Sequence, residues 1–145
     1  YFISLKESID IINKICGKEN FKIKDIMILG GSRIGLYTAE LLENEYRVTI
    51  VEKDKERCDE IAGYLNKTLV INMDGHDVQM LEEEGLTDMD ALISVTADSE
   101  MNIMSSLVGK KHGIKKTIAR IENFDYIHLS QSIGVDTLIN KKIIP

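Results

Sequence analysis

The segment whose residue types and spacing best fit a chemical task is glycine-rich and runs Leu29-Gly30-Gly31-Ser32-Arg33-Ile34-Gly35. Turns of the Gly-x-Gly-x-x-Gly type need a first glycine for tight turning, a second for close approach to a pyrophosphate, and a third for packing helix against strand. Gly30 and Gly35 occupy the first and third positions, whereas Ser32 occupies the second. The segment therefore predicts a phosphate-binding turn with one departure, where the serine hydroxyl could itself meet a phosphate oxygen.

An acid, Glu52, follows Gly30 by 22 residues and closes the next strand-like run. A carboxylate at this position can accept hydrogen bonds from both ribose hydroxyls, and it repels a 2′-phosphate. Glu52 therefore favours NAD, NADH, ATP or ADP over the NADP forms, and the alternative is a surface acid near an ordinary turn. Arg33 would pair with a terminal phosphate or remain solvated.

Strand-like and helix-like runs alternate from Lys22 onward. Strands are expected at Ile26–Leu29, Arg47–Glu52, Thr68–Met73, Ala91–Thr96, Lys116–Arg120 and Thr137–Ile139. Helices are expected at Ile34–Asn44, Lys55–Leu65, Asp77–Glu84, Ser99–His112 and Phe124–Ser132. Parallel neighbours in a sheet need crossover connections, so the alternation predicts an α/β fold: a Rossmann-type, doubly wound parallel sheet in three αβα layers.

Two of these helices show an apolar side that is expected to face the sheet. The residues expected to be available for burial are Ile34, Ala39, Leu41 and Leu42 in the first helix, and Cys58, Ile61, Ala62 and Leu65 in the second.

The opening residues precede the alternating pattern of strands and helices. They predict a separate appendage over residues 1–20, ahead of a main domain over 21–145. Tyr1–Leu5 is expected to be a strand. Lys6–Cys16 has apolar residues at helical spacing and is followed by Gly17 as a stop signal.

Composition narrows the function class. The formal charge of −6 over 145 residues argues against broad electrostatic binding to nucleic acid. No apolar run approaches the roughly 20 residues that span a bilayer, and the first residues do not form a signal peptide. Cys16 and Cys58 form no CxxC pair and are interpreted as buried thiols of a reducing cytosol.

Three further stretches, together with the glycine turn, resemble the regulator-of-potassium-conductance (RCK, or TrkA-N) domain family. Asn72-Met73-Asp74-Gly75-His76-Asp77 is similar to the family's acid-glycine turn after the third strand. Val95-Thr96-Ala97-Asp98-Ser99-Glu100-Met101-Asn102 is similar to its Thr-x-x-Asp-Glu-x-Asn segment, and Ile118-Ala119-Arg120 to the arginine that closes its fifth strand. The resemblance covers about residues 22–142.

The resemblance implies a set of binding residues and no catalytic ones. Residues Gly30, Gly31, Ser32, Arg33, Ile34 and Gly35 would cradle phosphates, and Glu52, next to Lys53, would bind ribose. Asp74 and Gly75 would flank the adenosine, and Thr96 and Ala97 would line the cofactor. Arg120 would reach a phosphate or a neighbouring subunit.

The family also implies a setting. Members work as cytosolic regulatory subunits at the inner face of the cell membrane, where they assemble as dimers or larger rings and gate a potassium transporter subunit. Members can carry two nucleotide domains in tandem, each followed by a small C-terminal lobe. Residues 1–20 are accordingly expected to be the tail of such a lobe, and the chain to be the second half of a tandem protein.

Several polar residues are expected to be structural. Asp74, His76 and Asp77 lie too close together in one turn to suggest tetrahedral zinc, so no metal is expected. His112 is expected to cap a helix end, and the acidic run Glu82-Glu83-Glu84 to be a solvated face, with ion binding at an assembly interface as the alternative. Tyr37 and Tyr46 are expected to be packing residues rather than catalytic acids, and His128 to be an ordinary residue of a helix face.

Three function classes remain open on the sequence. A nucleotide sensor needs only unequal binding to two conformations. An NAD-dependent oxidoreductase fragment shares the fold, but no Tyr-x-x-x-Lys signature and no substrate domain is present in the sequence. A scaffold with a vestigial site is kept open by Ser32.

Overall fold

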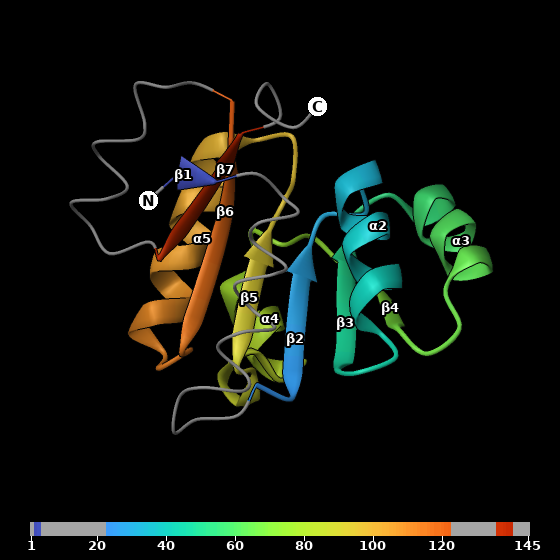
Figure 1. Ribbon diagram of the computed structural model, residues 1–145, viewed down its shortest axis with the longest axis horizontal. Coiled ribbons are helices and arrows are strands. Elements are labelled where there is room, and N and C mark those ends of the chain that lie inside the picture. Colours follow the sequence, from blue (N-terminus) through green and yellow to red (C-terminus); the bar gives the residue numbers. More distant parts are fainter. Residues whose placement is uncertain (1, 4–22, 123–135, 141–145) are drawn as a thin grey trace.

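The computed structural model describes residues 2–3, 23–122 and 136–140, and these build one seven-stranded parallel sheet with the order β1-β7-β6-β5-β2-β3-β4 (Figure 1). The strands are β1 (Phe2–Ile3), β2 (Asp25–Leu29), β3 (Arg47–Glu52), β4 (Leu69–Asn72), β5 (Ala91–Ser94), β6 (Lys116–Ile121) and β7 (Thr137–Asn140). Omitting β1, this is the Rossmann strand order. The doubly wound sheet is confirmed.

Helices cover both faces of the sheet, as expected for parallel strands joined by crossovers. The helices are α2 (Arg33–Leu42), α3 (Lys55–Tyr64), α4 (Val78–Glu83) and α5 (Ser99–Lys111), with a 3₁₀ turn at Leu86–Asp88. In Figure 1, α2 and α3 lie on one side of the central strands and α4 and α5 on the other.

Alternate residues of β2 point into two different cores. Ile26 and Ile28 belong to the cluster beneath α2 and α3, whereas Met27 and Leu29 belong to the cluster beneath α4 and α5. Because both faces are covered, the strand is apolar at every one of these positions, which is why it appears in the sequence as an uninterrupted apolar run.

The expected elements within the described ranges are confirmed to within a few residues. Two burial predictions are wrong: Leu41 is 46% exposed and Ala62 is exposed. The buried face of α2 is formed instead by Gly35, Thr38, Ala39 and Leu42. The helices expected at residues 6–16 and 124–132, with Cys16 and His128, lie outside the described residues.

The expected opening strand is present as β1, which pairs with β7 at the edge of the same sheet. The order in which successive strands are added to the sheet reverses at β2: β3 and β4 lie on one side of β2, and β5 lies on the other. Loops that leave neighbouring strands at such a reversal diverge and open a crevice at the carboxyl ends of the strands.

Candidate functional site

A cavity of about 430 Å³ opens at this crevice. Its volume lies within the range of about 300–1,000 Å³ typical of small-molecule sites. It is lined by Leu29, Gly30, Gly31, Ser32, Val51, Glu52, Lys53, Asp54, Arg57, Met73, Asp74, Gly75, His76, Thr96, Ala97, Asp98 and Met101. These residues come from the carboxyl ends of β2, β3, β4 and β5 and from the segments that follow them.

The glycine turn has the tight geometry that its sequence predicts. Gly30 has a φ of +107°, and a Cβ there would lie 2.9 Å from the backbone nitrogen of Thr96. A Cβ on Gly35 would overlap the carbonyl oxygen of Gly30. Both glycines are therefore required by backbone atoms that cannot move aside.

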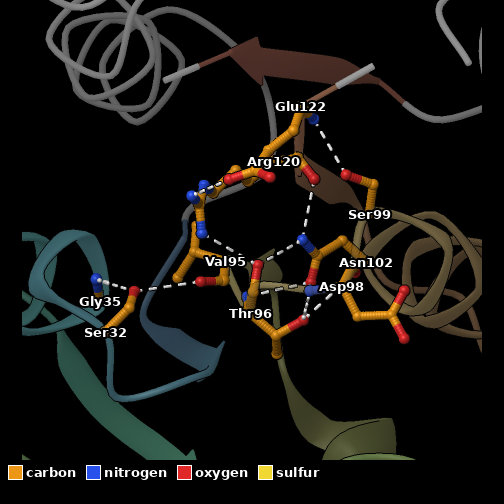
Figure 2. Close-up of polar contacts among 9 residues, drawn as sticks. All are labelled: Ser32, Gly35, Val95, Thr96, Asp98, Ser99, Asn102, Arg120 and Glu122. Atoms are coloured by element: carbon orange, nitrogen blue, oxygen red, sulfur yellow. Dashed lines mark hydrogen bonds and ion pairs between the residues drawn. The ribbon is translucent and has the colours of Figure 1, made fainter. Parts of the chain in front are cut away.

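Ser32, at the departing position of the motif, caps helix α2. Its hydroxyl accepts a hydrogen bond from the Gly35 backbone at 3.2 Å and donates its proton to the Val95 carbonyl at 3.1 Å (Figure 2). The hydroxyl thus ties the turn to the end of β5. The first N–H groups of a helix have no intrahelical acceptor, so the start of α2 presents donors where an anion is expected.

Glu52 faces the glycine turn. One carboxylate oxygen accepts a hydrogen bond from the Gly31 backbone at 2.7 Å, and the other accepts one from the Asp54 backbone at 2.9 Å. Arg57 holds the same residue at its other backbone polar group, because its Nε donates to the Gly31 carbonyl at 2.5 Å. The turn is therefore held both from the end of β3 and from α3, and Gly31 and Glu52 line the cavity side by side.

The wall after β4 is formed by a tight turn. Asp74 accepts hydrogen bonds from both the backbone and the ring Nδ1 of His76, each at 2.9 Å. The bonds from the His76 backbone and then from its ring lower the pKa of the Asp74 carboxyl. Asp77 accepts a hydrogen bond from the Met80 backbone and so caps α4.

The loop after β5 is held by one buried amide. Asn102, 1% exposed, accepts hydrogen bonds from the Thr96 backbone and hydroxyl at 3.0 and 2.6 Å. Its Nδ2 donates to the carbonyls of Thr96 at 2.9 Å and Arg120 at 2.8 Å (Figure 2). Both N–H groups and both oxygen lone pairs of the Asn102 amide are hydrogen-bonded, so the amide holds the loop that contains Thr96 and Ala97 rigidly in place.

Arg120 is buried next to this loop. Its guanidinium donates to the Thr96 carbonyl at 3.2 Å and pairs with Glu122 at 2.6 Å, while its Nε has no partner (Figure 2). Arg120 supports the loop from behind and is not among the residues that line the cavity. Its expected contact with a phosphate or a neighbouring subunit stays a prediction.

The structure brings most of the predicted residues together. Those that line the cavity are Gly30, Gly31, Ser32, Glu52, Lys53, Asp74, Gly75, Thr96 and Ala97. Those that do not are Arg33, Ile34, Gly35 and Arg120. Arg33 is exposed at the start of α2, and Gly35 acts through packing.

Sequence reasoning missed Arg57 and left His76 without a role in the cavity. A basic residue in the first turn of the helix that follows Glu52 is a signal that could have drawn attention to Arg57. The cavity wall carries four carboxylates, from Glu52, Asp54, Asp74 and Asp98, and two cations, from Lys53 and Arg57. Attraction of a phosphate therefore depends on nearby amides rather than on a broad positive field.

The remaining predictions concern residues away from the cavity. His112 caps α5 and also pairs with Glu82 of α4 at 2.8 Å. Glu82, Glu83 and Glu84 are all exposed, as expected for a solvated acidic run. The packing role predicted for Tyr37 is wrong, because its side chain is 54% exposed, whereas Tyr46 does pack against the core. Cys58 is buried, as predicted, and donates to the Glu52 carbonyl at 3.2 Å. Burial raises the pKa of the Cys58 thiol.

Residues 2–3, 23–122 and 136–140 contain neither a cluster of metal ligands nor a membrane-spanning helix. No three His, Cys, Asp or Glu side chains gather there as a metal site requires. Among the same residues, no helix combines the length and the apolar character needed to cross a membrane.

Comparisons with known proteins converge on one family. A model described as the TrkA-N domain matches residues 26–141. The Methanosarcina mazei protein named Trk system potassium uptake protein trkA homolog 1 is 36% identical over 138 residues, which cover 94% of this chain and 34% of that protein. The Haemophilus influenzae Trk system potassium uptake protein TrkA is 34% identical over 149 residues, covering 94% and 32%. The chain thus spans about a third of the length of these curated relatives.

Solved structures share the fold. The TrkA-N domain of the inner membrane protein ybaL from Escherichia coli superposes with a TM-score of 0.71 at 14% identity, covering 86% of this chain and 91% of that one. The GsuK channel bound to NAD gives 0.69 at 21% identity, covering 84% and 22%. GsuK bound to ADP gives 0.68 at 21% identity, covering 81% and 30%.

Proposed function

The chain belongs to the TrkA-N domain family, and from that membership we propose that it senses a nucleotide on behalf of a Trk-type potassium-uptake system. In this proposal it is a regulatory, non-catalytic part that binds NAD(H), ATP or ADP and gates a membrane-embedded potassium transporter. The relatives' names point to potassium uptake, and the proposal extends that role to this chain.

The observation that carries the proposal is the convergence of four loops on one cavity. The glycine turn offers helix-start amides, and hydrogen bonds from such amides to a charged phosphate are worth roughly 1.5–3 kcal/mol each. Glu52 lies across the cavity from the Thr96–Ala97 loop and has its carboxylate at the glycine turn. This arrangement supports phosphate held at the turn and ribose at the acid.

The nucleotide is proposed to lack a 2′-phosphate, because Glu52 and Asp54 would repel one. Two structures of a similarly folded protein, GsuK, are described as bound to NAD and to ADP. Both ligands share an adenosine diphosphate half, and that half fits a site built from the ends of β2 to β5. Arg33, exposed beside the turn, would pair with a terminal phosphate.

The partners follow from the same proposal. The chain would work in the cytoplasm, peripherally at the inner face of the membrane, as a homodimer or larger ring against the transporter subunit. Nucleic acid is not proposed as a partner. A difference of roughly 1–3 kcal/mol in nucleotide affinity between two arrangements would change gating 5- to 150-fold.

Residues 1–20 are proposed to be the tail of a preceding small lobe, with residues 21–145 forming the nucleotide-binding domain. The pairing of β1 with β7 is compatible with such a lobe packing its last strand against the edge of this sheet. The sequence of the parent protein tests this proposal, since an encoded start immediately before Tyr1 would overturn it.

Two other functions are set aside. An oxidoreductase is not favoured, because the relatives named here are potassium uptake proteins. A vestigial site is not favoured either, because Ser32 turns its hydroxyl to the Val95 carbonyl and leaves the cavity open.

Calorimetric titration with NADH, NAD, ATP and ADP tests the proposal. Saturable binding without turnover of the ligand is expected, and Glu52→Ala is expected to weaken it at least tenfold, because it removes the ribose acceptor and one clamp of the turn. Glu56→Ala, an exposed acid on α3 outside the cavity wall, is the matched control. Absence of binding at millimolar ligand, or equal affinity in both variants, would contradict the proposal.

A further inference from the structure

A second, largely apolar cavity of about 360 Å³ lies between α4 and α5 and joins the first. The residues common to both walls are Leu29, Gly75, His76, Asp98 and Met101. His76 is the only one of these five with a ring nitrogen, which can be an uncharged hydrogen-bond acceptor for a planar group at the junction.

The ring of His76 is held in one orientation by Asp74. Its Nδ1 lies 2.9 Å from the carboxylate, and the backbone N–H of His76 bonds to the same oxygen. An ionised carboxylate can only accept hydrogen bonds, so Nδ1 must carry the proton. In the neutral imidazole, Nε2 is then left with its lone pair exposed as a hydrogen-bond acceptor.

The rest of the junction suits a flat, largely apolar group. Leu29 and Met101 are buried beneath it, and a thioether makes favourable contacts with aromatic rings. Gly75 adds no side chain between His76 and this floor. The junction therefore offers an apolar floor, with two hydrogen-bond acceptors at its edge, the His76 ring nitrogen and the Asp98 carboxylate.

We propose that His76 selects the base of the bound nucleotide, accepting a hydrogen bond from the exocyclic amino group of adenine and rejecting a 6-oxo purine. The inference rests on the proposed nucleotide-binding function and adds a specificity-determining residue to it. A 6-oxo base would place a carbonyl lone pair against that of Nε2, so a favourable hydrogen bond is replaced by a repulsion.

Paired titrations with ADP and inosine 5′-diphosphate test the proposal, because the two ligands share ribose and phosphates and differ at position 6 of the base and the adjoining ring nitrogen. At pH 8 the wild-type chain is expected to prefer ADP by about tenfold, the ratio given by one hydrogen bond of ordinary strength. His76→Phe keeps the ring but lacks the acceptor, so the preference is expected to fall to less than about twofold. His76→Leu also lacks the acceptor, so it is expected to lose the preference for ADP to the same extent.

The control is His112→Phe, which makes the same substitution in a histidine outside both cavity walls. It should leave the preference for ADP unchanged. A tenfold preference that persists in His76→Phe would overturn the proposal and assign selection to the backbone or to the carboxylates of Asp74 and Asp98. Equal wild-type affinity for both diphosphates would also overturn it while leaving the nucleotide-sensing function intact. Failure of both ligands to bind would instead overturn the nucleotide function and this inference with it.

Discussion

Glu43 shows how one side chain can organise a loop far from the cavity. It is 6% exposed at the end of α2. Its carboxylate accepts hydrogen bonds from the backbones of Asn66, Lys67 and Thr68 and from the Thr68 hydroxyl, at 2.8–3.2 Å. Burial alone would raise the pKa of the carboxyl, but these hydrogen bonds outweigh burial and lower it.

Replacing Glu43 by Gln is expected to lower the free energy of unfolding by about 1–3 kcal/mol at pH 7, because hydrogen bonds to the charged acceptor are lost. Because the pKa of Glu43 is lowered in the folded state, its ionised carboxylate stabilises the fold at pH values above 4.5, the ordinary pKa of this group. That contribution is lost as the pH falls through the lower, folded-state value. Urea unfolding at pH 7 and at successively lower pH measures both effects.

Glu40→Gln, an exposed position on the same helix, serves as the control and should change stability by less than about 0.5 kcal/mol. If the two variants lost the same stability at pH 7, or if the loss at Glu43 grew as the pH fell, the carboxylate would not have the role described.

At the scale of elements, two helical glycines differ in whether the surrounding structure has room for a side chain. A Cβ on Gly35 of α2 would overlap a backbone carbonyl oxygen, whereas a Cβ on Gly63 of α3 would have no atom within 4 Å. Gly35 therefore sets how closely α2 approaches β2. Gly63 only makes its helix more flexible.

Gly35→Ala is accordingly expected to lower the free energy of unfolding by at least about 2 kcal/mol and to abolish nucleotide binding. Gly63→Ala is expected to raise it by about 0.5–1 kcal/mol through helix propensity and to leave binding unchanged. Chemical denaturation and calorimetry on both variants test this pair. Equal effects would mean that the contact at Gly35 is relieved by movement of the helix.

The elements themselves could be predicted from the sequence because their signals are local. Strands buried on both faces give continuous apolar runs, and Asp54, Asp77 and Asp98 cap the helices that follow them. The exposure of Leu41 could not be predicted in this way, because hydrophobicity ranks it above Thr38. The small residues Gly35 and Ala39 instead bring the opposite side of α2 against the sheet.

The candidate site was predictable only where a motif fixes both the residue and its place. The glycine turn and Glu52 have such a motif. Arg57 reaches a carbonyl 26 residues away in the sequence, and the burial of Arg120 depends on the packing of α5 against β6. These contacts are set by the assembled sheet. The place of Arg57 in the first turn of the helix after Glu52 is a local signal, but it does not specify the carbonyl that Arg57 contacts.

At the scale of the whole molecule, a ligand in the cavity would contact loops from four strands, β2 to β5. A ligand that binds only the folded state stabilises it by about 2.7 kcal/mol at a hundredfold excess over Kd. For a chain of 145 residues, this corresponds to a rise in Tm of roughly 5–10 °C. ADP or NADH is expected to give this rise, and Glu52→Ala a smaller one at the same ligand concentration.

The same ligand should also divide the molecule into protected and unprotected edges. Hydrogen exchange is expected to slow in the loops that follow β2, β3, β4 and β5, because these line the cavity. It should remain unchanged at the opposite edge, where Asp90 accepts hydrogen bonds from the backbones of Lys24 and Asp25. A rise in Tm with uniform protection would indicate binding elsewhere, whereas protection confined to the carboxyl edge would place the ligand between the glycine turn and Glu52.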